Sequence, residues 1–386
     1  MTAAIRKRII EQIEGWTKEQ LDFLIDLCSQ NSYTFHKAGT DRTAALILEK
    51  LLGALPLHEV HEQESIGDHH ILRNDVPGSP VYLLGHLDTV FPPDHPFQSC
   101  HIKNEWLYGP GTADMKGGLA VLVYALKALQ KAGVLASLPV VLILGADEEN
   151  GSATSRNLYE AERDRARICL VGECAGPAGE IVVSRNGKMG GRVDCTGRGR
   201  HVGTGSHEKA SAILEIAHKV IAFESLNASL PGVSLNVGKI EGGLGPSTVP
   251  AQAGFLFDLR WQDQAHYPIL LEQIHKIVSR REYAHCESVL TILNFRPAMP
   301  KGKKTGDLMD RLRRIGKGLG QEIKMEHRRG TSDGNYFGAS GIPTLDGFGP
   351  VGESDHTPEE RILISSLKDR TLLLALFLLD LGGRKG

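Results

Sequence analysis

The sequence lacks an excess of charge of either sign, because 44 basic residues are balanced by 46 acidic ones among 386 residues. Such a balance leaves no field that would attract nucleic acid or an anionic membrane surface. A membrane-spanning run is also lacking. The longest apolar run, residues 372–379, is far shorter than the roughly 20 residues that a span needs. We therefore expect a small-molecule partner, no nucleic acid and no membrane, and we interpret the apolar run as a buried C-terminal helix.

Cysteine is scarce and scattered, without a CxxC pair or a dense framework. The six residues are Cys28, Cys100, Cys169, Cys174, Cys195 and Cys286. Such usage is typical of thiols that are kept reduced in a cytosol. The N-terminal segment lacks the apolar core of a signal peptide, because Glu11 and Glu14 interrupt it. These features predict a cytoplasmic protein.

The first part of the chain, residues 1–184, alternates apolar strands with helices. PVYLLGH, LPVVLILG and RICLVG are continuous apolar runs of the kind that buried parallel strands show, and residues 117–133 have helical periodicity closed by Gly133. This order predicts an α/β domain with a parallel sheet. Ligands of such sheets lie at the carboxyl ends of the strands.

The middle of the chain, residues 185–295, has a different pattern. Alternating strands and two helices follow one another in the order strand, helix, strand, strand, helix, strand. This order predicts an inserted α+β domain of the ferredoxin-like type with one open sheet face. Residues 296–386 return to the α/β style. We therefore expect a first domain that is discontinuous and completed by the C-terminal segment.

Five short segments carry side chains that commonly bind metals. They are GHLDTVFP, GTADMKGG, DEENGS, VGEC and GESDHTPEE, which offer His86, Asp114, Glu148 or Glu149, Glu173 and His356. Two imidazoles and several carboxylates, with no thiolate among them, suit two divalent metals that share a carboxylate and activate a water. The set predicts a hydrolase.

Two further features support this interpretation. Asp88 lies two residues after His86 on the same face of a strand end, so it can accept the second ring N–H and orient the imidazole. Glu148 and Glu149 are adjacent, so one can bind metal while the other takes a proton. Taken singly, Asp88 and Asp114 could be helix N-caps and His356 a solvated loop residue.

In this order the segments resemble the co-catalytic metallopeptidase family of carboxypeptidase G-type glutamate carboxypeptidases, aminoacylases, and acetylornithine and succinyl-diaminopimelate deacylases. The likeness covers essentially the whole chain. It implies a zinc-dependent exopeptidase (phosphorylase/hydrolase-like) catalytic domain with an inserted lid domain that forms a homodimer. It also implies two Zn²⁺ per chain, with Co²⁺ or Mn²⁺ as possible substitutes. The implied bridging ligand is Asp114, the implied general base is Glu148, and the remaining implied ligands are His86, Glu149, Glu173 and His356.

The likeness extends into the insert, with departures. His201 in GRGRHVGTG matches a family histidine that reaches the partner subunit's site and stabilises the oxyanion. Arg200 and Val202 stand where the family usually has Ser and Ala. Ser247 replaces the family's usual Asn, which affects the hydrogen bonding expected around the substrate carbonyl.

Arg260 and Arg296 match arginine positions of glutamate carboxypeptidases and could bind a substrate carboxylate through bidentate hydrogen bonds. Each could equally be a solvated arginine at a strand end. The loop at 328–337 could present backbone N–H groups to an anionic substrate, or be a plain turn.

The sequence therefore predicts hydrolysis of a peptide or amide bond next to a free carboxylate. One alternative is an N-acyl amino acid deacylase, because acyl and peptidyl amides offer the metals the same chemistry. Glu173 stands where the family's aminopeptidases commonly carry Asp, which favours carboxypeptidases and deacylases together. Another alternative is a metal-free binding protein on the same fold, since fold and function are separable.

Overall fold

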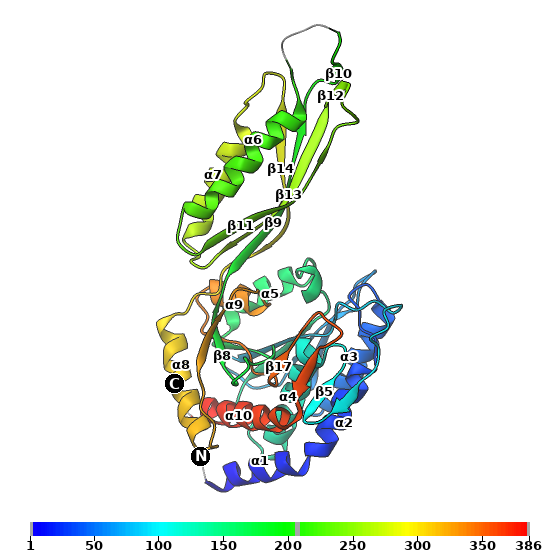
Figure 1. The fold of residues 1–386 in the computed structure, drawn as a ribbon. Helices are drawn as coiled ribbons and strands as arrows, with labels where there is room; N and C mark the ends of the chain where they lie inside the picture. The colour runs from blue at the N-terminus through cyan, green and yellow to red at the C-terminus, as the bar shows by residue number, and fades with distance from the viewer. Residues whose placement is uncertain (1–2, 205–208, 384–386) are drawn as a thin grey trace. The chain divides into compact units, whose positions relative to one another are not determined.

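The computed structural model describes residues 3–204 and 209–383, and the chain divides into two compact units (Figure 1). Unit 1 contains Met1–Ser184, Lys301–Arg328 and Ser332–Gly386. Unit 2 contains Arg185–Pro300 and Arg329–Thr331. Unit 1 is of the α/β class and unit 2 of the α+β class, so the predicted fold class is confirmed.

A six-stranded sheet forms the centre of unit 1. Its strand order is β1 (Leu57–His61), β2 (His69–Arg73), β6 (Val140–Gly145), β3 (Val81–His86), β7 (Ile168–Val171) and β16 (Thr344–Leu345). The strands β6, β3, β7 and β16 are parallel, and every residue of β3, β6 and β7 is buried. The edge formed by β1 and β2 is antiparallel, which the sequence did not indicate. Because β3, β6 and β7 are neighbours, the segments that follow them begin side by side.

Helices cover both faces of this sheet. Buried residues of α4 (Gly117–Lys131) and α10 (Ile364–Gly382) form the larger apolar core together with α1 (Ala3–Gly15), α2 (Thr17–Cys28), α3 (Lys37–Leu51) and α8 (Lys303–Lys317). A smaller cluster on the other face includes residues of α5 (Arg156–Glu162) and α9 (Gly334–Ala339). Along β3, Leu83 belongs to the first cluster, and Tyr82 and Leu84 belong to the second, as the alternation of a strand requires.

Short elements complete unit 1. A small sheet has the order β17 (Gly352–Glu353), β18 (Arg361–Leu363), β5 (Trp106–Tyr108) and β4 (His101–Lys103). Strand β8 (Ile181–Arg185) pairs with β15 (Met325–Arg328). Single turns of helix are η1 (Thr112–Lys116), η2 (Glu148–Asn150) and η3 (Arg163–Arg165). Two of these turns, η1 and η2, carry candidate site residues.

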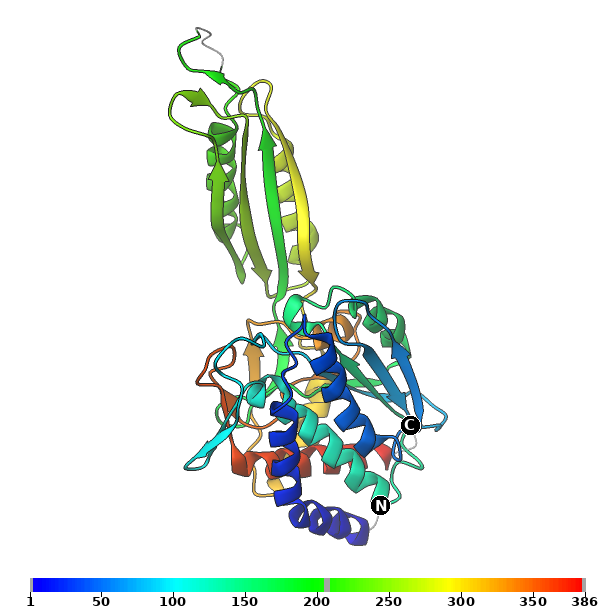
Figure 2. The ribbon, with the colours of Figure 1, turned by 90° about the vertical axis from the view of Figure 1, so that its right-hand side faces the viewer.

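Unit 2 is built on an antiparallel sheet whose strand order is β11 (Val233–Gly242), β13 (Gln252–Trp261), β9 (Gly187–Thr196) and β14 (Glu287–Arg296). Figure 2 shows α6 (Ala212–Glu224) and α7 (His266–Ser279) together on one face of it. Buried aromatic residues, among them Phe223, Phe255 and Trp261, fill the space between. A turn, η4 (Ser225–Ala228), follows α6, and β10 (Arg200–His201) pairs with β12 (Thr248–Val249). The order of the main elements is the predicted one.

Among the described residues, no helix combines the length and the apolar character that a membrane crossing requires. The apolar run near the C-terminus lies within α10, where residues 371–379 are all buried.

Candidate active site

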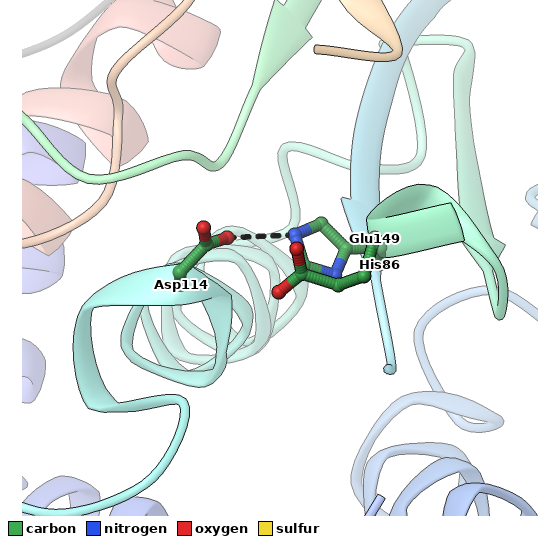
Figure 3. Close-up of side chains that lie close together, drawn as sticks. All are labelled: His86, Asp114 and Glu149. Carbon is green, nitrogen blue, oxygen red and sulfur yellow. Dashed lines mark hydrogen bonds and ion pairs between the residues drawn. The ribbon is translucent and has the colours of Figure 1, made fainter. Parts of the chain in front are cut away.

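His86 is the last residue of β3, and its ring is buried. Its Nε2 atom lies 2.9 Å from Oδ1 of Asp114 and 3.7 Å from Oε1 of Glu173, and a dashed line in Figure 3 marks the contact with Asp114. Its Nδ1 atom faces Asp88. The ring therefore lies between Asp88 on one side and two candidate ligands on the other.

Asp114 lies in η1, and its backbone is not helical (φ −122°, ψ 95°). Oδ2 of Asp114 lies 3.2 Å from Nε2 of His356, whereas Oδ1 faces His86. The turn begins at Gly111 with φ 75°, where a Cβ atom would lie 2.8 Å from a methyl group of Thr89. The two carboxylate oxygens of Asp114 thus contact two different imidazoles.

The pair Glu148 and Glu149 lies in η2, directly after β6. Oε2 of Glu149 lies 3.0 Å from Nε2 of His356. The carboxylate of Asp88 accepts two N–H groups of this turn. The N–H of Glu148 donates to Oδ1 at 3.1 Å, and the N–H of Glu149 donates to Oδ2 at 3.2 Å. Thr34 Oγ1 also donates to Asp88 Oδ2 at 2.7 Å. Asp88 therefore contacts both the imidazole and the two glutamates.

The electrostatics reflect this crowding of acidic and imidazole groups. Burial raises the pKa of Glu149 to about 8, with a further contribution from the charge of Asp114. Burial also raises the pKa of Glu173 well above its usual range. Burial opposes ionisation of Asp114, but hydrogen bonds from His356 and His86 outweigh it and lower its pKa. Hydrogen bonds to Asp114 and Glu149 raise the pKa of His356 to about 11.

The donor set fits divalent metal ions. His86, Asp114 and Glu149 each offer a ligand atom within 4.8 Å of the others, and so do Asp114, Asp355 and His356. Imidazole and carboxylate are ordinary ligands of zinc, and crowded buried carboxylates are stabilised by cations. Asp114 is the residue that the two groups share.

Sequence reasoning did not single out Asp355 and Glu360. Asp355 directly precedes His356, and this position next to a predicted ligand could have marked it as a candidate. Glu360 is buried, and its carboxylate accepts the N–H groups of Gly111, Ala113 and Asp114. Burial raises the pKa of Glu360 to about 7, although these hydrogen bonds oppose the shift. Its only signal in the sequence was its place in the segment GESDHTPEE.

Two of the predicted residues of the insert lie together in unit 2. His201 on β10 pairs with Thr248, and the N–H of Val202 donates to the carbonyl oxygen of Ser247. Both His201 and Ser247 are exposed. Nδ1 of His201 accepts the N–H of Gly203 at 3.1 Å, so the neutral ring carries its proton on Nε2. The last residue of the GRGRHVGTG segment, Gly205, lies outside the described residues.

The two predicted arginines share one row of the unit 2 sheet, since Lys188 of β9 pairs with Arg260 on one side and with Arg296 on the other. Arg260 is half-buried and donates to Oδ1 of Asp258 at 2.8 Å and to the carbonyl oxygen of Arg329 at 3.2 Å. Arg296 is buried. Directly opposed residues of a sheet are close neighbours, so the row brings three basic side chains together, and Asp258 pairs with both Arg260 and Lys188.

The loop at 328–337 binds several of its own N–H groups. The N–H of Ser332 donates to Asn335 Oδ1, and that of Gly334 donates to Ser332 Oγ. Asp333 accepts the hydroxyl groups of Ser152 and Tyr159. These contacts favour a structural turn over a cradle for an anionic substrate.

The chain is similar to known proteins over most of its length. The model of a family described as peptidase family M20/M25/M40 matches residues 82–380. Carboxypeptidase G2 of Pseudomonas sp. (strain RS-16) is 26% identical over 315 residues, which are 80% of this chain and 75% of that protein. A succinyl-diaminopimelate desuccinylase of Pseudoalteromonas atlantica is 28% identical over 315 residues, 75% of this chain and 81% of that protein.

Solved structures share the fold. A tripeptidase from Staphylococcus aureus superposes with a TM-score of 0.74 at 19% identity, covering 95% of this chain and 99% of that one. A metallo-carboxypeptidase from Sulfolobus solfataricus gives a TM-score of 0.71 at 18% identity, covering 94% and 98%.

Proposed function

The chain belongs to peptidase family M20/M25/M40 and is an enzyme of the peptidase or amidohydrolase type, and we propose that it hydrolyses its substrate with two metal ions held around Asp114. The observation that carries this proposal is the division of the Asp114 carboxylate between His86 and His356. A carboxylate that presents its two oxygens to separate imidazoles is suited to be a ligand shared by two metals.

The proposed ligands divide into two sets that share Asp114. His86 and Glu173 lie on the Oδ1 side, and Glu149 and His356 lie on the Oδ2 side. We propose two Zn²⁺ per chain, with Co²⁺ or Mn²⁺ as substitutes. Once bound, the metals supply Lewis-acid activation of water and of the scissile carbonyl.

Glu148 is the proposed general base. Its carboxylate takes the proton of the attacking water and returns it to the nitrogen of the leaving amine, a role worth about 10² to 10⁴ in rate. The turn that carries Glu148 is fixed by Asp88, because the N–H groups of Glu148 and Glu149 both donate to that carboxylate. His201 donates from Nε2 to the developing oxyanion, since its Nδ1 is occupied by Gly203.

The proposed substrate carries a free carboxylate next to the scissile bond, as in a glutamate carboxypeptidase. Arg260 and Arg296, which pair with Lys188 from either side, carry guanidinium groups of the kind that bind carboxylates in a bidentate manner. The similarity to carboxypeptidase G2 supports this choice.

A second candidate is an N-acyl amino acid deacylase. The similarity to succinyl-diaminopimelate desuccinylases favours it, and the proposed metal ligands and base serve an acyl amide equally well. Ser247 lies beside His201, so we propose that it contributes to recognition of the substrate carbonyl in either reaction.

We also propose a cytoplasmic homodimer formed through unit 2. Apolar side chains are exposed on α6, on the neighbouring end of β11 and in the loop that follows β11, including Ile213 (38%), Ile221 (71%), Ile240 (57%) and Leu244 (94%). Exposed apolar side chains gathered in this way are typical of protein interfaces. In such a dimer His201 would complete the site of the partner subunit.

A substrate panel tests the proposed function. The full chain is reconstituted with Zn²⁺ and offered peptides with C-terminal glutamate, N-acetyl and N-succinyl amino acids, and each compound with its α-carboxylate converted to an amide. Released amino acid or amine is quantified, and Glu148→Gln serves as the background control. We expect hydrolysis of the free acids and at least a tenfold loss for the amidated compounds. Equal rates for acids and amides would contradict carboxylate recognition, and no hydrolysis in the panel would contradict the proposal.

A further inference from the structure

Glu360 makes an unusual number of backbone contacts with one turn. Its Oε2 accepts the N–H of Gly111 at 3.0 Å. Its Oε1 accepts the N–H groups of Ala113 at 2.9 Å and of Asp114 at 3.0 Å. Glu360 is only 1% exposed and lies 246 residues after Asp114 in the sequence. A single buried carboxylate therefore satisfies three N–H groups of the turn that carries the shared ligand.

The backbone of Glu360 strengthens this connection. The N–H of Gly109 donates to the carbonyl oxygen of Glu360 at 3.2 Å, and the next residue, Arg361, begins β18 and pairs with Tyr108 of β5. At the other end of the turn, buried Lys116 donates to the carbonyl oxygens of Leu27 and Gln30 at 3.0 and 2.7 Å. The turn is thus fixed by the buried carboxyl group of Glu360 at its start and by the buried amino group of Lys116 at its end.

This turn needs such support for a physical reason. Asp114 is not helical, and Gly111, the residue before η1, has no side chain that could cap the turn, so the N–H groups of Gly111, Ala113 and Asp114 rely on the carboxylate of Glu360. Buried N–H groups without acceptors destabilise the folded state. A carboxylate can accept several hydrogen bonds at once, and Glu360 uses both oxygens for this purpose.

We propose that Glu360 is a positioning residue for the metal centre. Its carboxylate holds residues 111–114 so that Asp114 directs one oxygen to His86 and the other to His356. Because Glu360 lies four residues after His356, it also connects the segments that carry these two ligands. The inference rests on the proposed function, in which Asp114 and His356 bind metal.

Glu360 would act through Asp114 and would not bind metal itself, because both of its oxygens already accept N–H groups. The substitution Glu360→Gln tests this role. The amide of glutamine keeps one oxygen acceptor but turns an NH₂ group toward an N–H donor. Glu162→Gln is the matched control: Glu162 is also buried, at 7% exposure, and it accepts the hydroxyl of Tyr82 at 2.6 Å, away from the proposed ligands.

The first measurement is amide hydrogen exchange in the metal-free protein. We expect Gly111, Ala113 and Asp114 to exchange at least tenfold faster in Glu360→Gln than in wild type, and to be unchanged in Glu162→Gln. Exchange at the wild-type rate in Glu360→Gln would overturn the proposal. This readout is independent of metal, so it remains valid if the protein proves not to be a metalloenzyme.

The second measurement is the affinity for Zn²⁺, obtained by competition with a chromophoric chelator. Loss of a residue that orients a metal ligand typically costs 10- to 100-fold in affinity, and we expect that range for Glu360→Gln. Glu162→Gln should bind within twofold of wild type even if its melting temperature falls. An equal loss of affinity in both variants would indicate a general stability effect and overturn the proposal. If wild type itself bound no Zn²⁺, the proposed function would fail, and the exchange experiment alone would decide the role of Glu360.

A second variant covers the case in which Glu360→Gln does not fold. Glu360→Asp retains the negative charge but is one methylene shorter, so it cannot reach all three N–H groups. We expect a smaller acceleration of exchange at Gly111, Ala113 and Asp114, and wild-type exchange there would overturn the proposal in the same way.

Discussion

One ring nitrogen of His86, Nδ1, contacts two oxygens of Asp88: it lies 3.0 Å from the carbonyl oxygen and 3.3 Å from Oδ1. Two acceptors on this side hold a proton on Nδ1, so that Nε2 is the nitrogen directed at Asp114. The backbone oxygen makes the shorter contact. The carboxylate is therefore available to bind the N–H groups of Glu148 and Glu149 as well.

This arrangement predicts the effect of Asp88→Asn. Asparagine has the same shape but only one oxygen, so at least one N–H group of the Glu148 turn would face an NH₂ group. We expect Zn²⁺ affinity and kcat/KM to fall by about 10- to 100-fold, as for other residues that orient ligands. Competition titration and steady-state kinetics measure the two effects. Asp22→Asn, at an exposed position of α2, is the control and should match wild type.

The two glutamates of η2 should respond differently to removal of charge. Glu148→Gln should keep its metals and its substrate affinity while kcat falls by about 10² or more, because a general base is lost. Glu149→Gln should lose metal, since the carboxylate facing His356 is removed. Elemental analysis together with kinetics separates the two phenotypes. Exchanged phenotypes would reverse the assignment of the pair.

The shared position of Asp114 predicts metal stoichiometry. Elemental analysis after reconstitution should find about two zinc ions per chain, and chelators should abolish activity until metal is restored. Asp114→Asn should lose both ions together, because each set of ligands depends on one of its oxygens. Full activity with a single ion would contradict the two-metal proposal.

The proposed composite site predicts complementation between variants. His201→Ala should lower kcat by 10²-fold or more, as loss of other oxyanion donors does, with little change in substrate binding. In a mixed dimer with Glu148→Gln chains, one site would carry both defects and the other neither. Activity per heterodimer should recover toward half of the wild-type value. Heterodimers confirmed by mass without recovery would show that each chain completes its own site.

His70 predicts a pH dependence of stability outside the site. It is 6% exposed, and burial lowers its pKa from 6.5 to about 4. The unfolded chain therefore binds this proton more readily. The contribution of His70 to the free energy of unfolding is complete above pH 6.5 and is lost as the pH falls toward 4, by about 3 kcal/mol at most.

Urea unfolding at several pH values measures this effect. His70→Gln should be less sensitive to pH than wild type between pH 7 and 4, because glutamine does not titrate. His61→Gln, at an exposed position of β1, should retain the dependence of wild type. An unchanged slope in His70→Gln would show that His70 does not titrate in this way.

The buried strands were the most predictable part of the fold. β3, β6 and β7 are continuous apolar runs between turns, and such runs fit only strands that are covered on both faces. The edge strand β1 could not be found in this way, because its residues are mostly exposed and polar and its place depends on pairing with β2.

In the candidate site, too, some residues could be predicted from the sequence and others could not. His86, Glu149 and Glu173 could be predicted as candidates because each lies at or just after the end of a predicted strand, and neighbouring strands bring their ends together. Glu360 was not found, because its role consists of hydrogen bonds to a turn that no local pattern connects with it. The sequence also could not show that Gly203 occupies one nitrogen of His201.

Unit 1 is interrupted by unit 2, and this has a consequence for synthesis on the ribosome. The strands that carry His86, Glu149 and Glu173 emerge early, but α10, which packs on α4, is made after His356. Residues 185–300 form a contiguous block that can fold while unit 1 still lacks that helix. The apolar surface of α4 therefore stays uncovered by α10 until late in translation. A metal centre that includes His356 cannot form, and so cannot hydrolyse anything, before that residue has been synthesised.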